Sequence, residues 1–384
     1  MWKYGFMNLH YLDNSATTAV CKSAAEKALY MMTENFGNPS SLHKLGINAE
    51  LCVEEAREVI ADALSVQPKN IIFTSGGTEA NNTVLFGASE ALKRRGSRII
   101  VSAVEHSSVY ESAKRLGETG YDVQYAPVDS DGVIDLEQFD QLLTDKTILV
   151  SVMAVNNETG SIQPIEMIAK RIKRRSPDAV FHVDAVQAFC KMPLKPQKWG
   201  VDFMTVSAHK IHAPKGVGAL YIRGGARLIP LLYGGEQQKK IRPGTESAPL
   251  IAAFGEAVKE ADIAKNNAYI RELNDYAMTK LTAIDGVSIN SPASALPYII
   301  NISVEGIRSE TMLHHLEQSG VYVSSSSACA KGKRSYVLAA MGLSDDRIDS
   351  SIRISFSKYN TKEDIDALIE GLRSGIATLQ KVRS

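Results

Sequence analysis

The chain has 384 residues and a mass of 41.8 kDa, and 44% of its residues are hydrophobic, which suffices for two domains or one large one. Its 43 basic and 43 acidic side chains give a formal net charge of +0, so bulk charge does not favour nucleic acid or an anionic membrane. The apolar stretches are far shorter than the roughly 20 residues of a membrane-spanning helix, and the N-terminus does not fit a signal peptide. We therefore expect a cytoplasmic protein with reduced cysteines and with neither membrane nor direct nucleic-acid partners.

From about residue 70 onward, short β-branched runs alternate with longer helical patterns. Strands are predicted at residues 71–74, 99–102, 123–126, 148–154, 179–183, 203–206 and 218–222. Helices are predicted between them at residues 79–93, 108–116, 136–143 and 164–174. This alternation is typical of βαβ units, and it predicts an α/β domain with a mostly parallel seven-stranded sheet.

The pattern changes near Leu250, where a single long helical pattern runs from residue 249 to about residue 284. Further strands are predicted at residues 298–304, 321–324 and 352–356, and further helices at residues 309–319 and 361–382. These elements predict a smaller α+β domain. We expect a large domain over residues 15–258 and a small domain built from residues 1–14 and 259–384.

Two motifs lie where a strand meets a turn. Gly76, Gly77 and Thr78 follow the first strand and precede a helix, so backbone N–H groups and a hydroxyl could hold a phosphate there. A capped strand-to-helix turn without any ligand explains the same residues. Asp184 ends an apolar strand, at the edge where open α/β sheets bind ligands, and the alternative for it is a helix N-cap.

A third motif places Lys210 just past another strand, where an amine can act as a nucleophile, although a lysine on such a loop is more often solvated surface. A phosphate cradle, a carboxylate and a nucleophilic lysine are together the parts that hold pyridoxal phosphate. His106 and Asn157 also follow strands, and they could stack on a flat ring and bond its oxygen.

With these motifs, the sequence resembles the cysteine desulfurases of the NifS and IscS type, in the class V aminotransferase family. The resemblance spans nearly the whole chain and rests on motifs at residues 11–18, 38–41, 75–79, 105–106, 156–158, 184–187, 207–210, 242–245 and 327–329. It implies fold type I of the pyridoxal-phosphate enzymes. It also implies conversion of L-cysteine to L-alanine, with the sulfur transferred to an enzyme cysteine as a persulfide.

The resemblance implies a role for each cofactor residue. Lys210 would carry the cofactor through a Schiff base and then move the α-proton, Asp184 would pair with the pyridinium nitrogen, and His106 would stack on the ring. The remaining contacts to the phenolic oxygen and the phosphate would come from Gly77, Thr78, Asn157, Gln187, Ser207, His209 and Thr245. Thr245 would reach the phosphate of the neighbouring subunit, so the resemblance implies a homodimer.

The substrate carboxylate would be held by Asn38 and Arg353, with Asn157 beside them, as the resemblance implies. The residues themselves support Arg353, because apolar residues alternate with it along residues 351–356 and place it on the polar face of a strand. A guanidinium can hold a carboxylate through two parallel hydrogen bonds. The alternative is an ordinary exposed strand arginine.

Cys329 lies in a small, polar stretch with Lys331, Lys333 and Arg334 close behind it, and nearby cations favour the thiolate. A free cysteine is usually a small buried hydrophobe, which suits Cys52 and Cys190 better. The resemblance makes Cys329 the nucleophile that takes the sulfur. No resident metal site is predicted, although a transient iron–sulfur cluster at Cys329 stays open.

The expected partner is a sulfur-acceptor protein. The stretch after Cys329 is slightly shorter than in housekeeping desulfurases, and the chain ends at Ser384 without their C-terminal extension. A thiolation enzyme or a sulfur carrier is therefore an alternative to an iron–sulfur scaffold. Selenocysteine lyase and another class V aminotransferase remain alternative activities, whereas a non-catalytic scaffold would be expected to have lost Lys210 or Asp184.

Overall fold

The computed structural model describes residues 9–325 and 334–379, and its largest sheet has seven strands in the order β2-β8-β7-β6-β5-β3-β4. The strands are β2 (Ile71–Thr74), β3 (Arg98–Ser102), β4 (Asp122–Ala126), β5 (Thr147–Met153), β6 (Val180–Asp184), β7 (Phe203–Ser207) and β8 (Gly218–Ile222). Strand β8 runs opposite to the other six strands of this sheet, so its pairings with β2 and β7 are antiparallel and the remaining pairings are parallel. The predicted mostly parallel sheet is confirmed, with strand ends within one residue of those expected.

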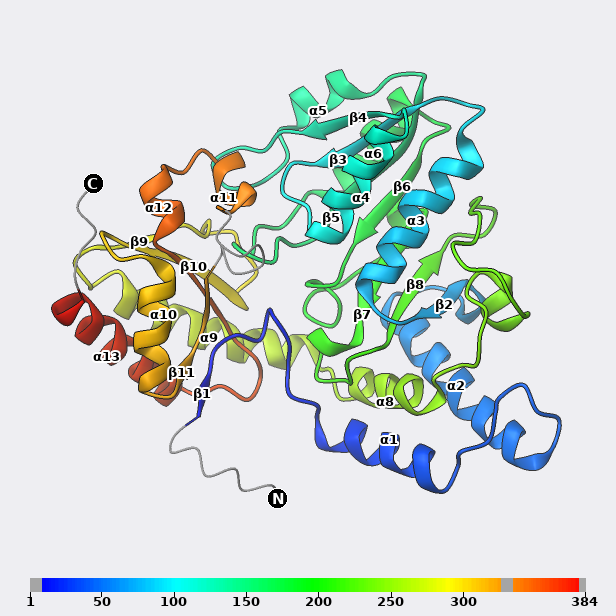
Figure 1. Ribbon diagram of the computed structural model, residues 1–384, viewed down its shortest axis with the longest axis horizontal. Helices are drawn as coiled ribbons and strands as arrows, with labels where there is room; N and C mark the ends of the chain where they lie inside the picture. Colours follow the sequence, from blue (N-terminus) through cyan, green and yellow to red (C-terminus); the bar gives the residue numbers. More distant parts are fainter. Residues whose placement is uncertain (1–8, 326–333, 380–384) are drawn as a thin grey trace.

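Helices cover both faces of this sheet, with α3 (Gly77–Leu92) in front in Figure 1. Alternate residues of β3 explain why both faces are covered. Ile99 and Val101 pack into the apolar cluster of α3 and α4 (Ser107–Glu118), whereas Ile100 packs into the main core with α6 (Ile165–Arg175). Strands buried on both faces read as continuous apolar runs, which is why the sequence revealed them.

Two N-terminal helices were not predicted, α1 (Lys22–Thr33) and α2 (Lys44–Ala63), and both pack against α8 (Ala248–Lys259). The prediction of one helix over residues 249–284 is wrong, because the chain breaks into α8 and α9 (Ile263–Leu281). The side chain of Asp262 accepts a hydrogen bond from the backbone N–H of Lys265 at 3.0 Å, and this cap starts the second helix.

The second sheet is antiparallel and has the order β12-β13-β10-β9. Its strands are β9 (Val287–Ile289), β10 (Ile299–Val304), β12 (Ser324–Ser325) and β13 (Ser351–Ser355). Strand β1 (His10–Tyr11) pairs in parallel with β11 (Val321–Tyr322), so residues 10–11 lie beside the C-terminal part of the described chain (Figure 1). The strand predicted at residues 321–324 is instead two short strands, β11 and β12. The division of the chain into two domains stays a prediction.

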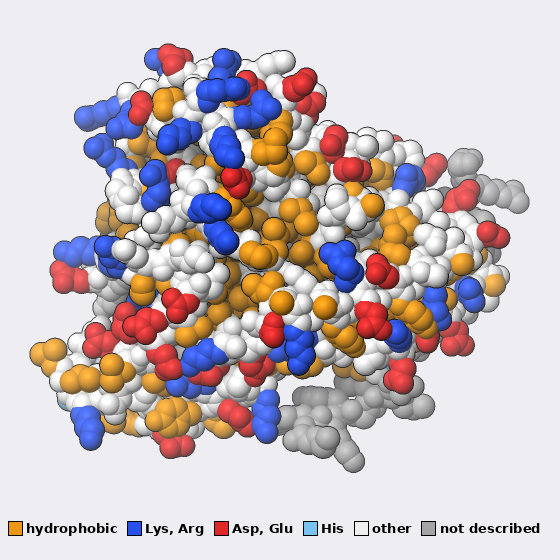
Figure 2. All heavy atoms as spheres, turned by 180° about the vertical axis from the view of Figure 1, so that it is seen from behind, with side chains coloured by type: hydrophobic (Ala, Val, Ile, Leu, Met, Phe, Trp, Pro, Cys, Tyr) orange, Lys and Arg blue, Asp and Glu red, His pale blue; other side chains and the backbone are white. Residues whose placement is uncertain are grey.

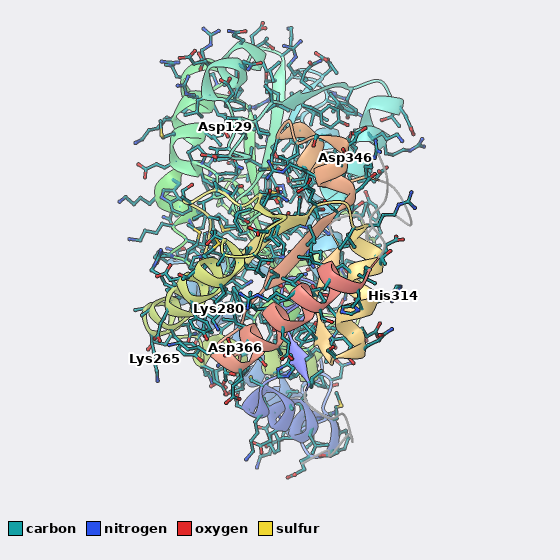
Figure 3. All side chains as sticks on the ribbon, turned by 90° about the vertical axis from the view of Figure 1, so that its left-hand side faces the viewer. Asp129, Lys265, Lys280, His314, Asp346 and Asp366 are labelled. Atoms are coloured by element: carbon teal, nitrogen blue, oxygen red, sulfur yellow. The ribbon has the colours of Figure 1, made fainter. Side chains whose placement is uncertain are left out.

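The C-terminal helices pack on this smaller sheet. Helix α13 (Lys362–Thr378) lies beside α9, and Figure 3 shows Lys280 of α9 and Asp366 of α13 close together. Their ion pair measures 2.6 Å, but both side chains are exposed, so it adds little stability. Helix α10 (Ser309–Gln318) confirms a predicted helix, whereas α13 ends at Thr378, before the predicted residue 382.

Short elements complete the described chain. They are η1 (Pro68–Asn70), α5 (Leu136–Leu142), α7 (Pro196–Trp199), η2 (Ala208–Lys210), η3 (Gln237–Lys240), α11 (Tyr336–Ala340) and α12 (Asp345–Asp349). Within residues 9–325 and 334–379, no helix combines the length and the apolar character needed to span a membrane.

Lys and Arg side chains gather over the upper part of the face seen in Figure 2. Helix α6, which covers the rear of the large sheet, ends in Lys173, Arg174 and Arg175. Cations are favoured at a helix C-terminus, and Asp140 forms salt bridges with Arg174 and Arg175. Local electrostatics at the end of α6 therefore stabilise these basic residues.

Candidate active site

A cavity of about 370 Å³ opens at the C-terminal ends of β6 and β7, beside the first turn of α3. This is the edge of the sheet at which open α/β folds bind ligands. Ten residues predicted for the site line the cavity: Gly77, Thr78, His106, Asn157, Asp184, Gln187, Ser207, His209, Lys210 and Arg353. The chain thus brings together residues that are up to 276 positions apart in the sequence, from Gly77 to Arg353.

One end of the cavity is built to receive an anion. Gly76 has a φ of +151°, a backbone conformation that favours glycine, and it turns the chain from β2 into α3. The first N–H groups of α3 have no partner within the helix, and Gly77 and Thr78 carry them to the cavity wall. Ser207 adds a buried hydroxyl, which has no hydrogen-bond partner among the described residues. This end therefore offers donors that a phosphate can satisfy.

The carboxylate of Asp184 is held rigidly at the end of β6. Its Oδ1 accepts a hydrogen bond from the backbone N–H of Val186 at 2.9 Å, and its Oδ2 accepts one from Nδ2 of Asn81 at 2.7 Å. Asp184 is 4% exposed, and a buried carboxylate needs such donors. Since the residues after Asp184 form a turn and no helix, the N-cap alternative does not hold.

Lys210 ends the short helix η2 and reaches back to the start of the chain. Its Nζ donates hydrogen bonds to the backbone carbonyls of Ser15 and Ala16, the second at 2.7 Å. His209, beside it, contacts Thr17 Oγ1 through Nδ1 at 3.2 Å. Burial, with a smaller contribution from the neighbouring Lys210, lowers the pKa of His209 to about 4, so this imidazole stays neutral.

His106 caps α4 and presents its ring to the cavity. Its Nδ1 accepts a hydrogen bond from the backbone N–H of Ser108 at 3.1 Å and contacts Ser108 Oγ at 2.8 Å. An accepting Nδ1 leaves the ring proton on Nε2. Burial has the largest effect on the pKa of His106 and lowers it. The negative charge of Asp184 raises this pKa by less, and the positive charge of Lys210 lowers it. The ring is therefore a neutral, flat surface in the cavity wall.

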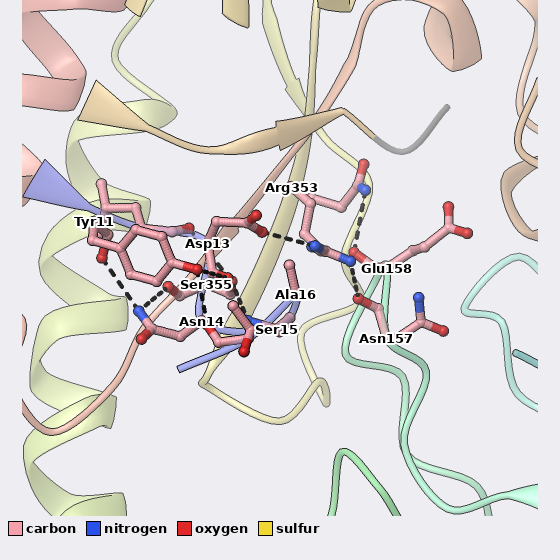
Figure 4. Close-up of polar contacts among 12 residues, drawn as sticks. Tyr11, Asp13, Asn14, Ser15, Ala16, Asn157, Glu158, Arg353 and Ser355 are labelled. Carbon is pink, nitrogen blue, oxygen red and sulfur yellow. Dashed lines mark hydrogen bonds and ion pairs between the residues drawn. The ribbon is translucent and has the colours of Figure 1, made fainter. Parts of the chain in front are cut away.

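Arg353 lies on β13 and reaches the cavity from the smaller sheet. Figure 4 shows its guanidinium between Asp13 and Asn157. One terminal nitrogen pairs with Asp13 Oδ1 at 2.8 Å, and the other donates to the backbone carbonyl of Asn157 at 3.1 Å. Its Nε is buried without a hydrogen-bond partner among the described residues. The exposed-arginine alternative is wrong, because Arg353 is only 6% exposed.

Two predicted residues that the structure describes, Asn38 and Thr245, do not line the cavity of this single chain. Asn38 is exposed in the loop between α1 and α2, where its side chain accepts a hydrogen bond from the backbone N–H of Ser40. Thr245 is also exposed, on the segment after η3. The roles of both stay predictions. Cys329 lies outside the described residues.

Sequence reasoning missed several cavity residues. Asn81 orients Asp184, and Ser15 receives Lys210 through its carbonyl oxygen. The signal for Asn81 was present, because it follows Gly77 by four residues in the same helix and so lies on the same face. Ser15 acts through its backbone, which no side-chain pattern can reveal.

A buried carboxyl group lies next to the cavity. The Oε1 of Glu105 accepts hydrogen bonds from Ser102 Oγ and from the backbone N–H of Met153, both at 2.6 Å. Burial raises the pKa of Glu105 to about 8, and nearby Asp184 raises it as well. The folded protein therefore binds a proton that the unfolded chain releases at a lower pH. The contribution of Glu105 to the stability of the fold therefore decreases as the pH rises toward 8.

Replacing Glu105 with glutamine should flatten this dependence. Between about pH 6 and pH 8 the wild type should lose about 2 kcal/mol of unfolding free energy that Glu105→Gln does not lose. Urea unfolding of both proteins at the two pH values measures the difference, and the contribution of buried Glu158 cancels because both proteins contain it. If the unfolding free energies of the two proteins depended equally on pH, Glu105 would be ionised in the folded protein.

Comparison with known proteins confirms the resemblance and the fold class. The sequence pattern described as aminotransferase class-V matches residues 10–368. Cysteine desulfurase IscS of Dictyoglomus turgidum is 40% identical over 378 residues, covering 97% of this chain and 95% of the relative. A solved structure named NifS-like protein has a TM-score of 0.92 and 38% identity, covering 97% of this chain and 100% of that one. Another, named SspA in complex with cysteine, has a TM-score of 0.81 and 32% identity, covering 91% and 99%. The chain therefore belongs to the aminotransferase class-V family.

Proposed function

We propose that this chain is a cysteine desulfurase, which uses pyridoxal 5'-phosphate to convert L-cysteine to L-alanine and keeps the sulfur on Cys329 as a persulfide. The observation that carries the proposal is that Lys210, Asp184 and the buried Ser207 hydroxyl line one cavity. The relative from Dictyoglomus turgidum supports the same activity. The test is alanine release from L-cysteine by the protein loaded with pyridoxal phosphate, and its absence would contradict the proposal.

The cavity residues fit the polar groups of pyridoxal phosphate. The unpartnered hydroxyl of Ser207 and the start of α3 suit the phosphate, and the carboxylate of Asp184 suits a protonated ring nitrogen. Gln187 and Asn157 line the same cavity and can face the ring oxygen. When bound, the cofactor supplies an electron sink for charge that develops at the α-carbon of an amino acid.

Lys210 and His106 would act on and around the reacting atoms. The carbonyls of Ser15 and Ala16 hold the Lys210 amine at the cavity wall, where it can attach the cofactor and then accept the α-proton. The neutral ring of His106 provides a flat face for stacking. Because this imidazole is neutral, His106 adds no second positive charge to the cavity that holds the Lys210 amine.

Arg353 would bind the carboxylate of L-cysteine. The guanidinium is fixed by Asp13 and Asn157, and its buried Nε still lacks a partner among the described residues. Because this guanidinium is already fixed, it can hold a carboxylate with little further loss of side-chain conformational freedom. Asn38 would assist, as the family resemblance implies.

Replacing Arg353 with lysine should raise KM for L-cysteine by about tenfold or more and change kcat less, because lysine cannot form the paired hydrogen bonds. Steady-state alanine formation measures both constants. Arg373→Lys on the exposed face of α13 is the matched control and should change neither. A KM for Arg353→Lys equal to that of the control would remove Arg353 from the substrate site.

Cys329 would receive the sulfur. Three other cysteines are described, and Cys21 and Cys190 are buried. Burial raises the pKa of Cys190 to about 12, so its thiol does not form the attacking thiolate at neutral pH. Cys329 has basic sequence neighbours that favour a thiolate. The sulfur would then pass to an acceptor protein, a thiolation enzyme, a sulfur carrier or an iron–sulfur scaffold.

A second copy of this chain would complete the site. Apolar side chains are exposed on α1, near the start of α2 and before η3: Leu29, Tyr30, Met32, Phe36, Leu42, Leu45, Ile47, Leu51, Leu231, Leu232 and Tyr233. The loop of Asn38 and the segment of Thr245 lie close together here, since Ser40 and Glu246 line one surface cavity. Exposed apolar surface of this kind is typical of an interface. Light scattering should give twice the chain mass, and a monomer would contradict the homodimer.

A further inference from the structure

Lys191 is a buried lysine with no role in the chemistry proposed above. It is 7% exposed, and its Nζ lies 5.4 Å from the centre of the Tyr298 ring. No carboxylate in residues 9–325 or 334–379 forms a salt bridge with it. Burying an ammonium group without a carboxylate costs free energy, and an apolar side chain of similar size would pack there at lower cost. Packing alone therefore does not explain a lysine at this position.

The polar contact of Lys191 leads into the cavity. Its Nζ donates a hydrogen bond to Oε1 of Gln187 at 3.3 Å. The Nε2 of Gln187 donates to the backbone carbonyl of Ser15 at 3.0 Å, and the same carbonyl accepts a hydrogen bond from Lys210. A continuous chain of hydrogen bonds thus joins Lys191, outside the cavity, to Lys210 inside it.

The chemistry of the Lys191 ammonium group fixes which atoms donate and which accept in this series of hydrogen bonds. An ammonium can only donate, so it selects the oxygen of the Gln187 amide and turns the NH₂ group the other way. That NH₂ group has two hydrogens, of which Ser15 takes one. The second is then available on the side of Gln187 that lines the cavity. Without Lys191, rotation of the amide by half a turn would present an acceptor there instead.

We propose that Lys191 is a positioning residue, which holds the Gln187 amide with its NH₂ group toward the cavity so that it donates to the ring oxygen of bound pyridoxal phosphate. This inference rests on the proposed function. It assigns Lys191 an effect on the cofactor that is exerted through Gln187.

The charged and titratable groups around Lys191 are either neutral or cationic. Burial raises the pKa of the Cys190 thiol and of the Tyr298 hydroxyl, so both stay neutral. Burial lowers the pKa of Lys191 to about 8, and Arg353 lowers it as well. A second cavity is lined by Lys191 together with His212, Lys210 and Lys358, and burial lowers the pKa of His212 to about 4. Lys191 is therefore mostly protonated near pH 7.

The test compares Lys191→Met and Lys191→Gln with Lys198→Met, a control at an exposed lysine on α7. Both Lys191 variants should weaken pyridoxal phosphate binding by about fivefold, because the donor to the ring oxygen is no longer fixed. They should also raise the midpoint of the pH-dependent change in the cofactor's visible absorbance. The fixed Gln187 donor and the Lys191 cation both favour release of a proton from the bound cofactor, so their loss shifts that release to higher pH. The control should change neither value.

A double substitution separates positioning from packing. In a Gln187→Ala background, Lys191→Met should weaken cofactor binding no further, because the residue through which it acts is gone. A full additional fivefold loss would overturn the proposal, as would wild-type binding and midpoint in both Lys191 variants. Failure of both variants to fold would also overturn it, by assigning Lys191 a structural role. If the wild type itself binds no pyridoxal phosphate, the proposed function fails first.

Discussion

Replacing Lys210 with alanine should lower alanine formation from L-cysteine by at least about ten thousandfold, because in the proposed mechanism this one side chain would both attach the cofactor and move the α-proton. The structure supports this double role, since the Lys210 amine is held by the carbonyls of Ser15 and Ala16 at the wall that also carries Asp184. No other lysine lines this cavity within the described part of the chain.

Borohydride reduction followed by peptide mass spectrometry provides the second measurement. The wild type should retain the cofactor on the peptide that contains Lys210, and Lys210→Ala should retain none. Lys215→Ala, an exposed lysine in the same loop, is the matched control and should behave as the wild type does. Substantial turnover by Lys210→Ala would assign both roles to another residue.

Replacing Cys329 with alanine should leave binding of cofactor and L-cysteine intact and lower alanine release by at least about a hundredfold. In the proposed mechanism the C–S bond would break when the Cys329 thiolate attacks the substrate sulfur, and Cys190 would not replace it because burial raises the pKa of Cys190 to about 12. Binding is followed by the visible absorbance and product by an alanine assay.

Cys52→Ala is the control for this substitution, because Cys52 is partly exposed yet contacts Asn35 in the packing of α1 and α2. It should keep wild-type turnover. Normal alanine release by Cys329→Ala would contradict the persulfide mechanism. Keto-acid production by that variant would instead favour an ordinary transaminase.

Most strands of the large sheet were predictable from the sequence because they are buried on both faces and read as short, continuous apolar runs, whereas the edge strand β4 is buried only at Ala126. Helices α1 and α2 were not, because their apolar residues serve two purposes. Met31 and Ala49 face the core, whereas Leu29 and Leu51 are exposed, so the apolar spacing has no single helical face. The break between α8 and α9 depends on one capping side chain, Asp262, inside an otherwise helical pattern.

The site was predictable to the extent that its residues end strands or begin helices. Asp184, Ser207 and Gly77 do so, and they meet at one edge of the sheet. Asp13, which fixes Arg353, was not predictable as its partner, because the ion pair depends on the N-terminal segment packing beside β13. Backbone acceptors such as the Ser15 carbonyl leave no trace in the side-chain pattern.

The most direct test of the central claim is the visible absorbance of the purified protein before and after addition of L-cysteine, with alanine and Cys329-bound sulfur assayed in the same sample. We expect an absorbance band of bound pyridoxal phosphate that shifts on addition of L-cysteine, with alanine released and a persulfide on Cys329. A colourless protein that cannot be reconstituted with pyridoxal phosphate would contradict it.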